Sequence, residues 1–131
     1  MLVALPLALT LLSSSGPRVQ VTDSLVLSEN FTSQFEFARV ELEAGHVYRV
    51  EVRGAHQLLL EPIESGVQGA RIHREFRSTD ASRTITISVT AQVTAVYQLR
   101  ASPMEVTGAP VRIYLDQGAT SRFQKLAEPH Q

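Results

Sequence analysis

Basic side chains are concentrated in one stretch of the sequence, between residues 71 and 83. They are Arg71, His73, Arg74, Arg77 and Arg83. Every second residue from Arg71 to Arg77 faces the same side of a strand, so three of these groups share one face with Glu75. Such a face attracts carboxylates, anionic glycans or lipid headgroups. These five residues are therefore the candidate interaction face. A solvated surface that protects an edge strand is the alternative interpretation.

Glu61 and Glu64 are the pair of carboxylates best spaced for chemistry, because two carboxylates perform glycoside hydrolysis. Catalytic acids need apolar enclosure and aromatic side chains around the sugar, whereas the chain has no tryptophan. The Gly-x-Ser-x-Gly motif of serine hydrolases is absent, and Gly66 to Gly69 has no phosphate-loop lysine. We therefore predict that the protein is not an enzyme and has no catalytic residues. A small glycan hydrolase is the alternative.

Metal and cofactor sites also find no support in the sequence. The histidines are His46, His56, His73 and His130. The first two flank an expected strand and lie too far apart to share an ion, and His73 has arginine neighbours. The aspartates are isolated, and a chain without cysteine has no thiolate ligand. We predict no metal site, no cofactor-binding residues and no cofactor.

The composition allows one ordinary domain. The chain has 131 residues, 44% of them hydrophobic, with a formal net charge of -1. The apolar fraction is too high for a disordered chain, and the balanced charge provides no basic field for a nucleic acid. We therefore exclude nucleic acid as a partner.

Residues 1–16 have the pattern of a secretory signal. Met1 to Leu12 reads MLVALPLALTLL, an uncharged run too short to span a bilayer, and small residues suited to cleavage follow it. No basic residue precedes this run, which favours a true start upstream of Met1. Such an extension could turn the cleaved signal into a short, uncleaved N-terminal anchor, which is the alternative. The absence of cysteine excludes a lipid anchor. We predict export to the periplasm or the exterior, with peripheral membrane association as the alternative.

The rest of the chain alternates apolar and polar residues with a period of two. We predict strands at 19–27, 35–43, 47–53, 57–61, 70–77, 83–90, 95–101 and 110–116. Eight short strands without crossover helices predict an all-β fold, an antiparallel, jelly-roll-like β-sandwich over residues 19–117. After Gln117 the alternation ends, and residues 118–131 are expected to be a loose tail, with at most one docked helical turn at Phe123 and Leu126.

One hairpin is expected in detail. Pairing Leu42 with Tyr48 also sets Glu41 opposite Arg49, around a turn that contains Gly45. The alternation places the upstream residues Phe35 and Phe37 on the same face of the strand as Arg39, which is the charged, outer face. This predicts either a bulge near Ala38 or an apolar patch on the outer face of the sheet.

Two stretches carry a resemblance to a known family. Residues 35–66 read FEFARVELEAGHVYRVEVRGAHQLLLEPIESG and residues 83–102 read RTITISVTAQVTAVYQLRAS. They resemble the opening strands and the closing hairpin of bacterial pre-peptidase C-terminal-type (PPC-like) domains, over about residues 25–116. The sequence departs from that family at Ala95 and Val96, where a glycine usually precedes the tyrosine, and it has no match for the acidic calcium ligands of some members.

The resemblance implies a secreted, non-catalytic sandwich. We therefore expect an exported binding or structural domain that contacts another envelope or membrane-associated protein. The alternatives are an accessory extracytoplasmic subunit of a membrane complex and a carbohydrate-binding module with a glycan as its partner.

Overall fold

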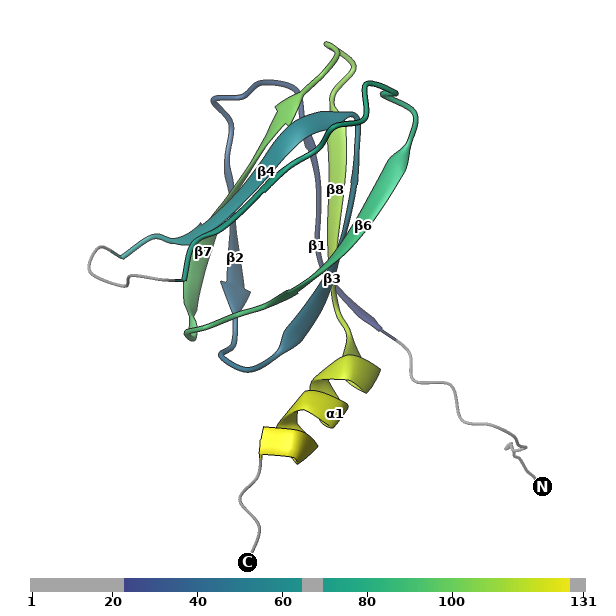
Figure 1. The fold of residues 1–131 in the computed structure, drawn as a ribbon. Coiled ribbons are helices and arrows are strands. Elements are labelled where there is room, and N and C mark those ends of the chain that lie inside the picture. Colours follow the sequence, from purple (N-terminus) through teal and green to yellow (C-terminus); the bar gives the residue numbers. More distant parts are fainter. Residues whose placement is uncertain (1–22, 65–69, 128–131) are drawn as a thin grey trace, which may run out of the picture.

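Eight strands and one helix make up the residues that the computed structural model describes, 23–64 and 70–127 (Figure 1). In chain order they are β1 (Ser24–Phe31), β2 (Ala38–Leu42), β3 (Val47–Arg53), β4 (Ala55–Pro62), β5 (Ile72–Glu75), β6 (Thr84–Thr90), β7 (Ala95–Pro103), β8 (Ala109–Leu115) and α1 (Gln117–Ala127). The predicted signal segment, residues 1–16, lies outside the described residues. The beginning of the first predicted strand, residues 19–22, also lies outside them. The strand ends later than predicted, at the buried Phe31 rather than at residue 27.

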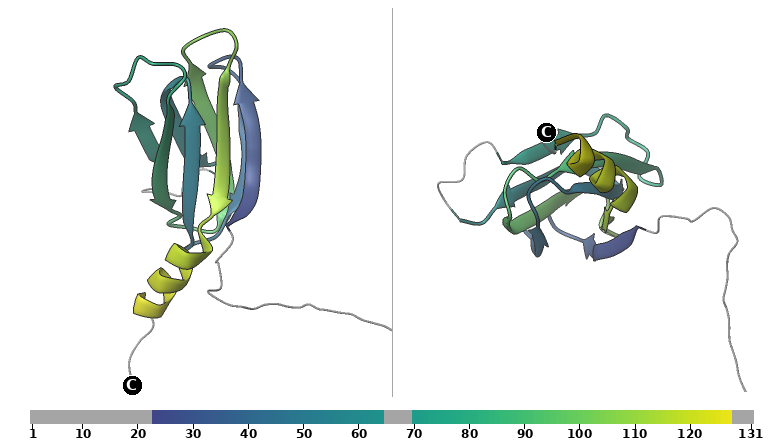
Figure 2. Two further views of the ribbon diagram at one scale, coloured as in Figure 1. Left: turned by 90° about the vertical axis from the view of Figure 1, so that its right-hand side faces the viewer. Right: turned by 90° about the horizontal axis from the view of Figure 1, so that it is seen from below.

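The strands form two four-stranded antiparallel sheets, in the orders β1-β8-β3-β6 and β2-β7-β4-β5. The two sheets pack face to face in Figure 1 and Figure 2. Within the described residues, only β4 and β5 are consecutive strands that pair with each other. This order is that of a jelly roll, in which two Greek keys wrap around one core. The predicted all-β, jelly-roll-like sandwich is confirmed.

The alternation of the sequence places the core between the sheets. In β7, Tyr97, Leu99 and Ala101 are buried, whereas Gln98 and Arg100 face outward. The largest fully buried side chains are Leu42, Val50, Val52, Leu58, Leu60, Tyr97, Leu99, Val111 and Ile113. Both sheets contribute to this set, and each such side chain is worth roughly 1.5–3 kcal/mol of burial. The apolar faces of the predicted strands are therefore the faces that form the core.

The predicted hairpin between residues 38–42 and 48–52 is wrong. Leu42 of β2 pairs with Ala95 of β7. Tyr48 of β3 pairs with Val89 of β6 and Leu115 of β8, in the opposite sheet. The two strands are joined by an arch that crosses the core, and an arch satisfies the same apolar alternation as a hairpin. The pattern therefore identified the buried face of each strand without identifying its neighbour.

The backbone of the arch is held by a second connection between the sheets. The Gly45 N–H donates to the Ala91 carbonyl at 2.9 Å, and the Ala91 N–H donates to the His46 carbonyl at 3.2 Å. Ala91 lies between β6 and β7, which also belong to opposite sheets. Two arches thus satisfy one another's hydrogen bonds at one end of the sandwich.

A single glycine forms the corner between β3 and β4. Gly54 follows Arg53 and precedes Ala55, so the chain changes sheets within one residue. Its φ is 70°, a conformation that favours glycine. A Cβ on Gly54 would lie 3.1 Å from the Ala81 carbonyl oxygen and 3.3 Å from that of Gly108. Gly54 is therefore required both by its backbone conformation and by the backbone packed against it.

The helix α1 replaces the predicted loose tail as far as Ala127. Asp116 begins it by accepting a hydrogen bond from the Ala119 N–H at its Oδ1, 3.0 Å away. The buried Thr120 Oγ1 accepts from the Val47 N–H at 2.8 Å and donates to the Val47 carbonyl at 3.0 Å. Figure 2 shows α1 beneath the end of the sandwich. A capping carboxylate and one buried hydroxyl hold this helix, so no apolar stripe marked it in the sequence.

Candidate functional site

The five basic residues of the predicted interaction face do not lie on one face. Arg71 and His73 line the same hollow on the outer side of the β2-β7-β4-β5 sheet. Arg74 has the opposite parity, and its guanidinium donates to the His73 carbonyl at 3.1 Å. Arg77 is exposed beyond the end of β5, and Arg83 precedes β6 in the other sheet. The structure therefore brings Arg71 and His73 together and separates Arg83 from them.

We call this feature the cationic hollow, a depression of about 360 Å³. Its lining includes Phe35, Gln57, Leu59, Arg71, His73, Arg100 and Ser102. The hollow is built by three neighbouring strands, because Leu59 of β4 pairs with His73 of β5 on one side and with Arg100 of β7 on the other. Two guanidinium groups and one imidazole thus converge on one depression, Arg71 and His73 from the start of β5 and Arg100 from β7.

A chain of hydrogen bonds fixes the polar floor of the cationic hollow. Gln57 Nε2 donates to Ser102 Oγ at 3.2 Å, and Gln57 Oε1 lies 2.9 Å from His73 Nε2. Since the amide oxygen of Gln57 can only accept, the proton of this second bond belongs to His73 Nε2. The three side chains come from β7, β4 and β5 and are held in register across the sheet.

Aromatic rings and guanidinium groups lie side by side next to the hollow. Phe35 is 77% exposed and Phe37 is 47% exposed. The guanidinium carbons of Arg39 and Arg100 lie 5.9 and 5.8 Å from the centre of the Phe37 ring, within the range of cation–π attraction. We call these four residues the aromatic–arginine face. Of the two arrangements predicted for Phe35 and Phe37, the structure shows the apolar patch on the outer face.

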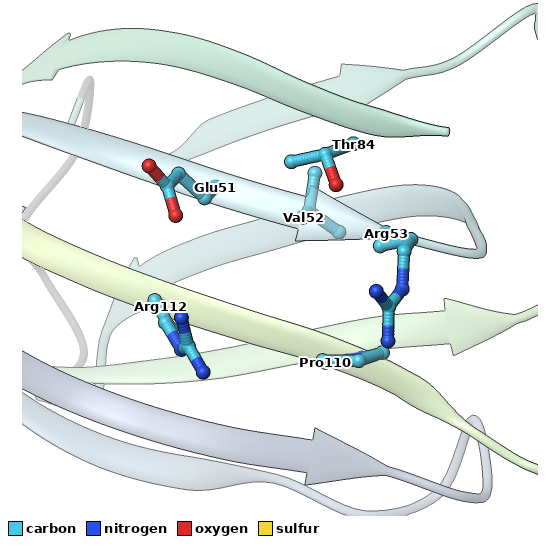
Figure 3. A pocket seen from close by; sticks show the side chains of 6 residues that line it. All are labelled: Glu51, Val52, Arg53, Thr84, Pro110 and Arg112. Carbon is cyan, nitrogen blue, oxygen red and sulfur yellow. The ribbon is translucent and has the colours of Figure 1, made fainter. Parts of the chain in front are cut away.

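The outer face of the other sheet is electrostatically balanced. A hollow of about 100 Å³ there is lined by Glu51, Arg53 and Arg112, together with Val52, Thr84 and Pro110. Figure 3 shows the Arg53 side chain extending toward Pro110, with Glu51 and Arg112 on neighbouring strands. Charges of both signs therefore share this smaller hollow, unlike the cationic hollow.

Arg49, on the same outer face, is neutralised by its neighbours. It forms ion pairs with Asp23, at 3.1 Å, and with Glu51. Its guanidinium also stacks over the Tyr114 ring at 4.3 Å. Desolvation lowers the pKa of Arg49, but the hydrogen bonds to the two carboxylates outweigh it and raise the pKa above its usual value. Arg49 is thus a partner of Asp23 and Glu51 rather than of Glu41, the partner expected from the predicted hairpin.

The carboxylates considered for hydrolysis are not enclosed. Glu61 is half-buried on β4 opposite Gln98, and Glu64 is exposed. In residues 23–64 and 70–127, no three histidine, aspartate or glutamate side chains gather as metal donors. Within the same residues, α1 is the helix present, and it is neither long nor apolar enough to cross a membrane.

Comparison with known proteins adds no relative. The chain matches no protein-family model and no curated protein. The function is therefore inferred from the site itself.

Sequence reasoning identified Arg71 and His73 but missed Arg100, Gln57 and Ser102. Alternation shows that Arg100 faces outward, because it lies between the buried Leu99 and Ala101. Its proximity to His73 depends on β4 lying between β5 and β7. The sequence contains no signal for that neighbourhood.

Proposed function

We propose that this protein is a non-catalytic binding domain that acts outside the cytoplasm, through protein–protein contacts in the bacterial cell envelope. The aromatic–arginine face is the observation that carries the proposal. Aromatic residues, phenylalanine included, and arginine are enriched in protein interfaces, and exposed apolar side chains gathered on one face indicate such an interface. The half-exposed Phe37 ring between Arg39 and Arg100 is the centre of the expected contact.

The signal pattern of residues 1–16 and the resemblance of residues 25–116 to PPC-like domains support the location and the non-catalytic role. Fractionation of the source cells, followed by the intact mass of the recovered protein, tests the location. We expect an extracytoplasmic protein that begins after the small residues Ser13 to Gly16. Recovery in the cytoplasm with residues 1–16 retained would contradict export.

The binding role is tested by capturing partners from envelope extracts with the tagged protein. We expect a specific partner to be captured by the natural chain and lost with the double substitution Phe35→Ser and Phe37→Ser. Phe35 is largely exposed and Phe37 half-exposed, and neither belongs to the core, so the double substitution is expected to change the free energy of unfolding by no more than about 1 kcal/mol.

Leu126→Ser is the matched control, because Leu126 is 82% exposed on α1, outside the aromatic–arginine face. Its capture of the partner should equal that of the natural chain. Loss of capture with Leu126→Ser alone would instead assign the contact to the C-terminal helix, as expected for an accessory subunit docked through its C-terminal end. A partner retained by both variants would contradict the proposed face.

A further inference from the structure

The charge of the cationic hollow is of one sign. Arg71, His73 and Arg100 are among the described residues that line it, and none of those residues is an aspartate or a glutamate. Among the described residues, neither arginine forms an ion pair within 4.0 Å. Arg49, on the opposite sheet, differs in this respect, because it forms ion pairs with two carboxylates of the same chain. The described residues that line the cationic hollow supply no carboxylate for its two arginines, so both guanidinium groups are free to pair with a carboxylate of a ligand.

The hollow also presents hydrogen-bond donors in fixed positions. The Ser102 hydroxyl accepts from Gln57 and retains its own proton for donation. Arg100 is oriented by the Phe37 ring beside it. When the Gln98 amide is turned with its oxygen toward Arg100, that oxygen accepts from the guanidinium at 2.8 and 3.0 Å. A planar guanidinium held in place binds a carboxylate through two parallel hydrogen bonds.

The rim of the hollow indicates which kind of carboxylate fits. Phe35 and Leu59 line the depression, and the exposed Phe37 ring extends its apolar surface. Phenylalanine and leucine offer no hydrogen bond to a ligand, so an apolar side chain matches this part of the surface. A carboxylate next to an apolar side chain is characteristic of an acidic peptide segment.

We infer that the cationic hollow binds the carboxylate side chains of an acidic, partly apolar segment of the partner protein. This inference rests on the proposed function and assigns the chemistry of its binding site. Carboxylates of the segment pair with Arg71 and Arg100 and accept from the Ser102 hydroxyl. Its apolar side chains cover Phe35 and Phe37.

The test uses a fluorescein-labelled nine-residue peptide of alternating glutamate and leucine, titrated with the full chain and followed by fluorescence anisotropy. We expect binding that weakens about tenfold in Arg71→Gln and in Arg100→Gln, as for the loss of one charge-assisted pair. The matched control is Arg112→Gln, an exposed arginine on the outer face of the other sheet. Its affinity should be unchanged.

Three results would overturn the inference. Equal weakening by Arg112→Gln would indicate general charge attraction, and equal binding of a peptide with glutamine for glutamate would exclude carboxylate recognition. Tighter binding of polygalacturonate that depends on the same two arginines would assign the hollow to an acidic glycan. Thermal unfolding followed by circular dichroism checks that each variant is folded.

Failure of this inference is distinguishable from failure of the proposed function. If Arg71→Gln and Arg100→Gln still capture the envelope partner while the double substitution at Phe35 and Phe37 does not, the binding role stands and the hollow is not its carboxylate site. If no variant changes capture, the aromatic–arginine face is also wrong.

Discussion

Arg100 is the residue at which the two parts of the candidate site meet. It lines the cationic hollow, and its guanidinium also lies beside the Phe37 ring of the aromatic–arginine face. A ligand carboxylate bound to Arg100 would therefore lie next to an aromatic surface, which excludes water and strengthens the pair. The charge and the apolar surface of the site are thus expected to act together.

Asp80 shows how a single carboxylate shapes a turn. Ser82 donates to Asp80 Oδ1 from its hydroxyl, at 2.6 Å, and from its backbone N–H, at 3.0 Å. The hydroxyl bond, then the backbone bond, lowers the pKa of Asp80 below its usual value. A lowered pKa stabilises the folded state above the unfolded pKa, and this contribution is lost as the pH falls through the folded value. The group is fully exposed, so we expect a weakened turn rather than acid unfolding.

A comparison of Gly45 and Gly54 distinguishes the cost of backbone strain from the cost of steric contact. Gly54 and Gly45 have φ values of 70° and 82°, so alanine at either position is strained, by about 1–2 kcal/mol. A Cβ on Gly54 also meets two backbone carbonyls, whereas a Cβ on Gly45 meets only the Phe123 ring, at 3.6 Å. We expect Gly54→Ala to lower the free energy of unfolding more than Gly45→Ala, by at least about 1 kcal/mol. Urea unfolding of both variants measures the difference, and equal losses would contradict the steric part.

At the scale of the elements, the sequence predicted where each strand lies far better than it predicted which strands pair with one another. The buried face of Tyr97, Leu99 and Ala101 could be predicted, because alternation with a period of two can be recognised within a single strand. Which strand lies beside β7 depends on contacts with residues 38–42 and 55–62, distant in the chain. The same limit explains the wrong hairpin and the missed member of the site, Arg100. Predicting the hollow would have required the strand order.

The buried hydroxyl of Thr120 joins α1 to β3, and its contribution to stability can be tested. Thr120→Val keeps the shape of the side chain but leaves the Val47 N–H without its acceptor, whereas the Val47 carbonyl still accepts from the Asp116 N–H at 2.9 Å. We expect the free energy of unfolding to fall by about 1–3 kcal/mol, the cost of one buried N–H left without an acceptor. Thr120→Ser keeps the hydroxyl and should retain most of this stability. The measurement is urea unfolding, with amide hydrogen exchange of α1, and a serine variant as unstable as the valine variant would refute the role of the hydroxyl.

The whole molecule has one core shared by two sheets, so the sheets are expected to unfold together. Leu99 is fully buried in β7, and Leu99→Ala should lower the free energy of unfolding by about 2–5 kcal/mol. Because such a domain has only about 5–15 kcal/mol in total, the loss is a large fraction of its stability. Leu126→Ala, at an exposed position on α1, is expected to change it by less than about 0.5 kcal/mol.

Two spectroscopic probes, measured on these variants, test whether the two sheets unfold in one transition. Far-ultraviolet circular dichroism follows both sheets, and tyrosine fluorescence follows Tyr48 and Tyr114 in one sheet and Tyr97 in the other. Coincident transitions are expected for the natural chain and for Leu99→Ala. Transitions at different urea concentrations would mean that the sheets are independent units.

The pairing of β1 with β8 has a consequence for the time course of folding. Ser24 pairs with Leu115, and its hydroxyl accepts a hydrogen bond from Gln117, 93 residues along the chain. Because β8 also lies between β1 and β3, neither β1 nor the middle of its sheet is complete until the last strand arrives. Chains dominated by such distant pairings reach the native state in milliseconds to seconds rather than microseconds. Until then the strands have open edges, and the nascent protein is at its most prone to associate with other chains.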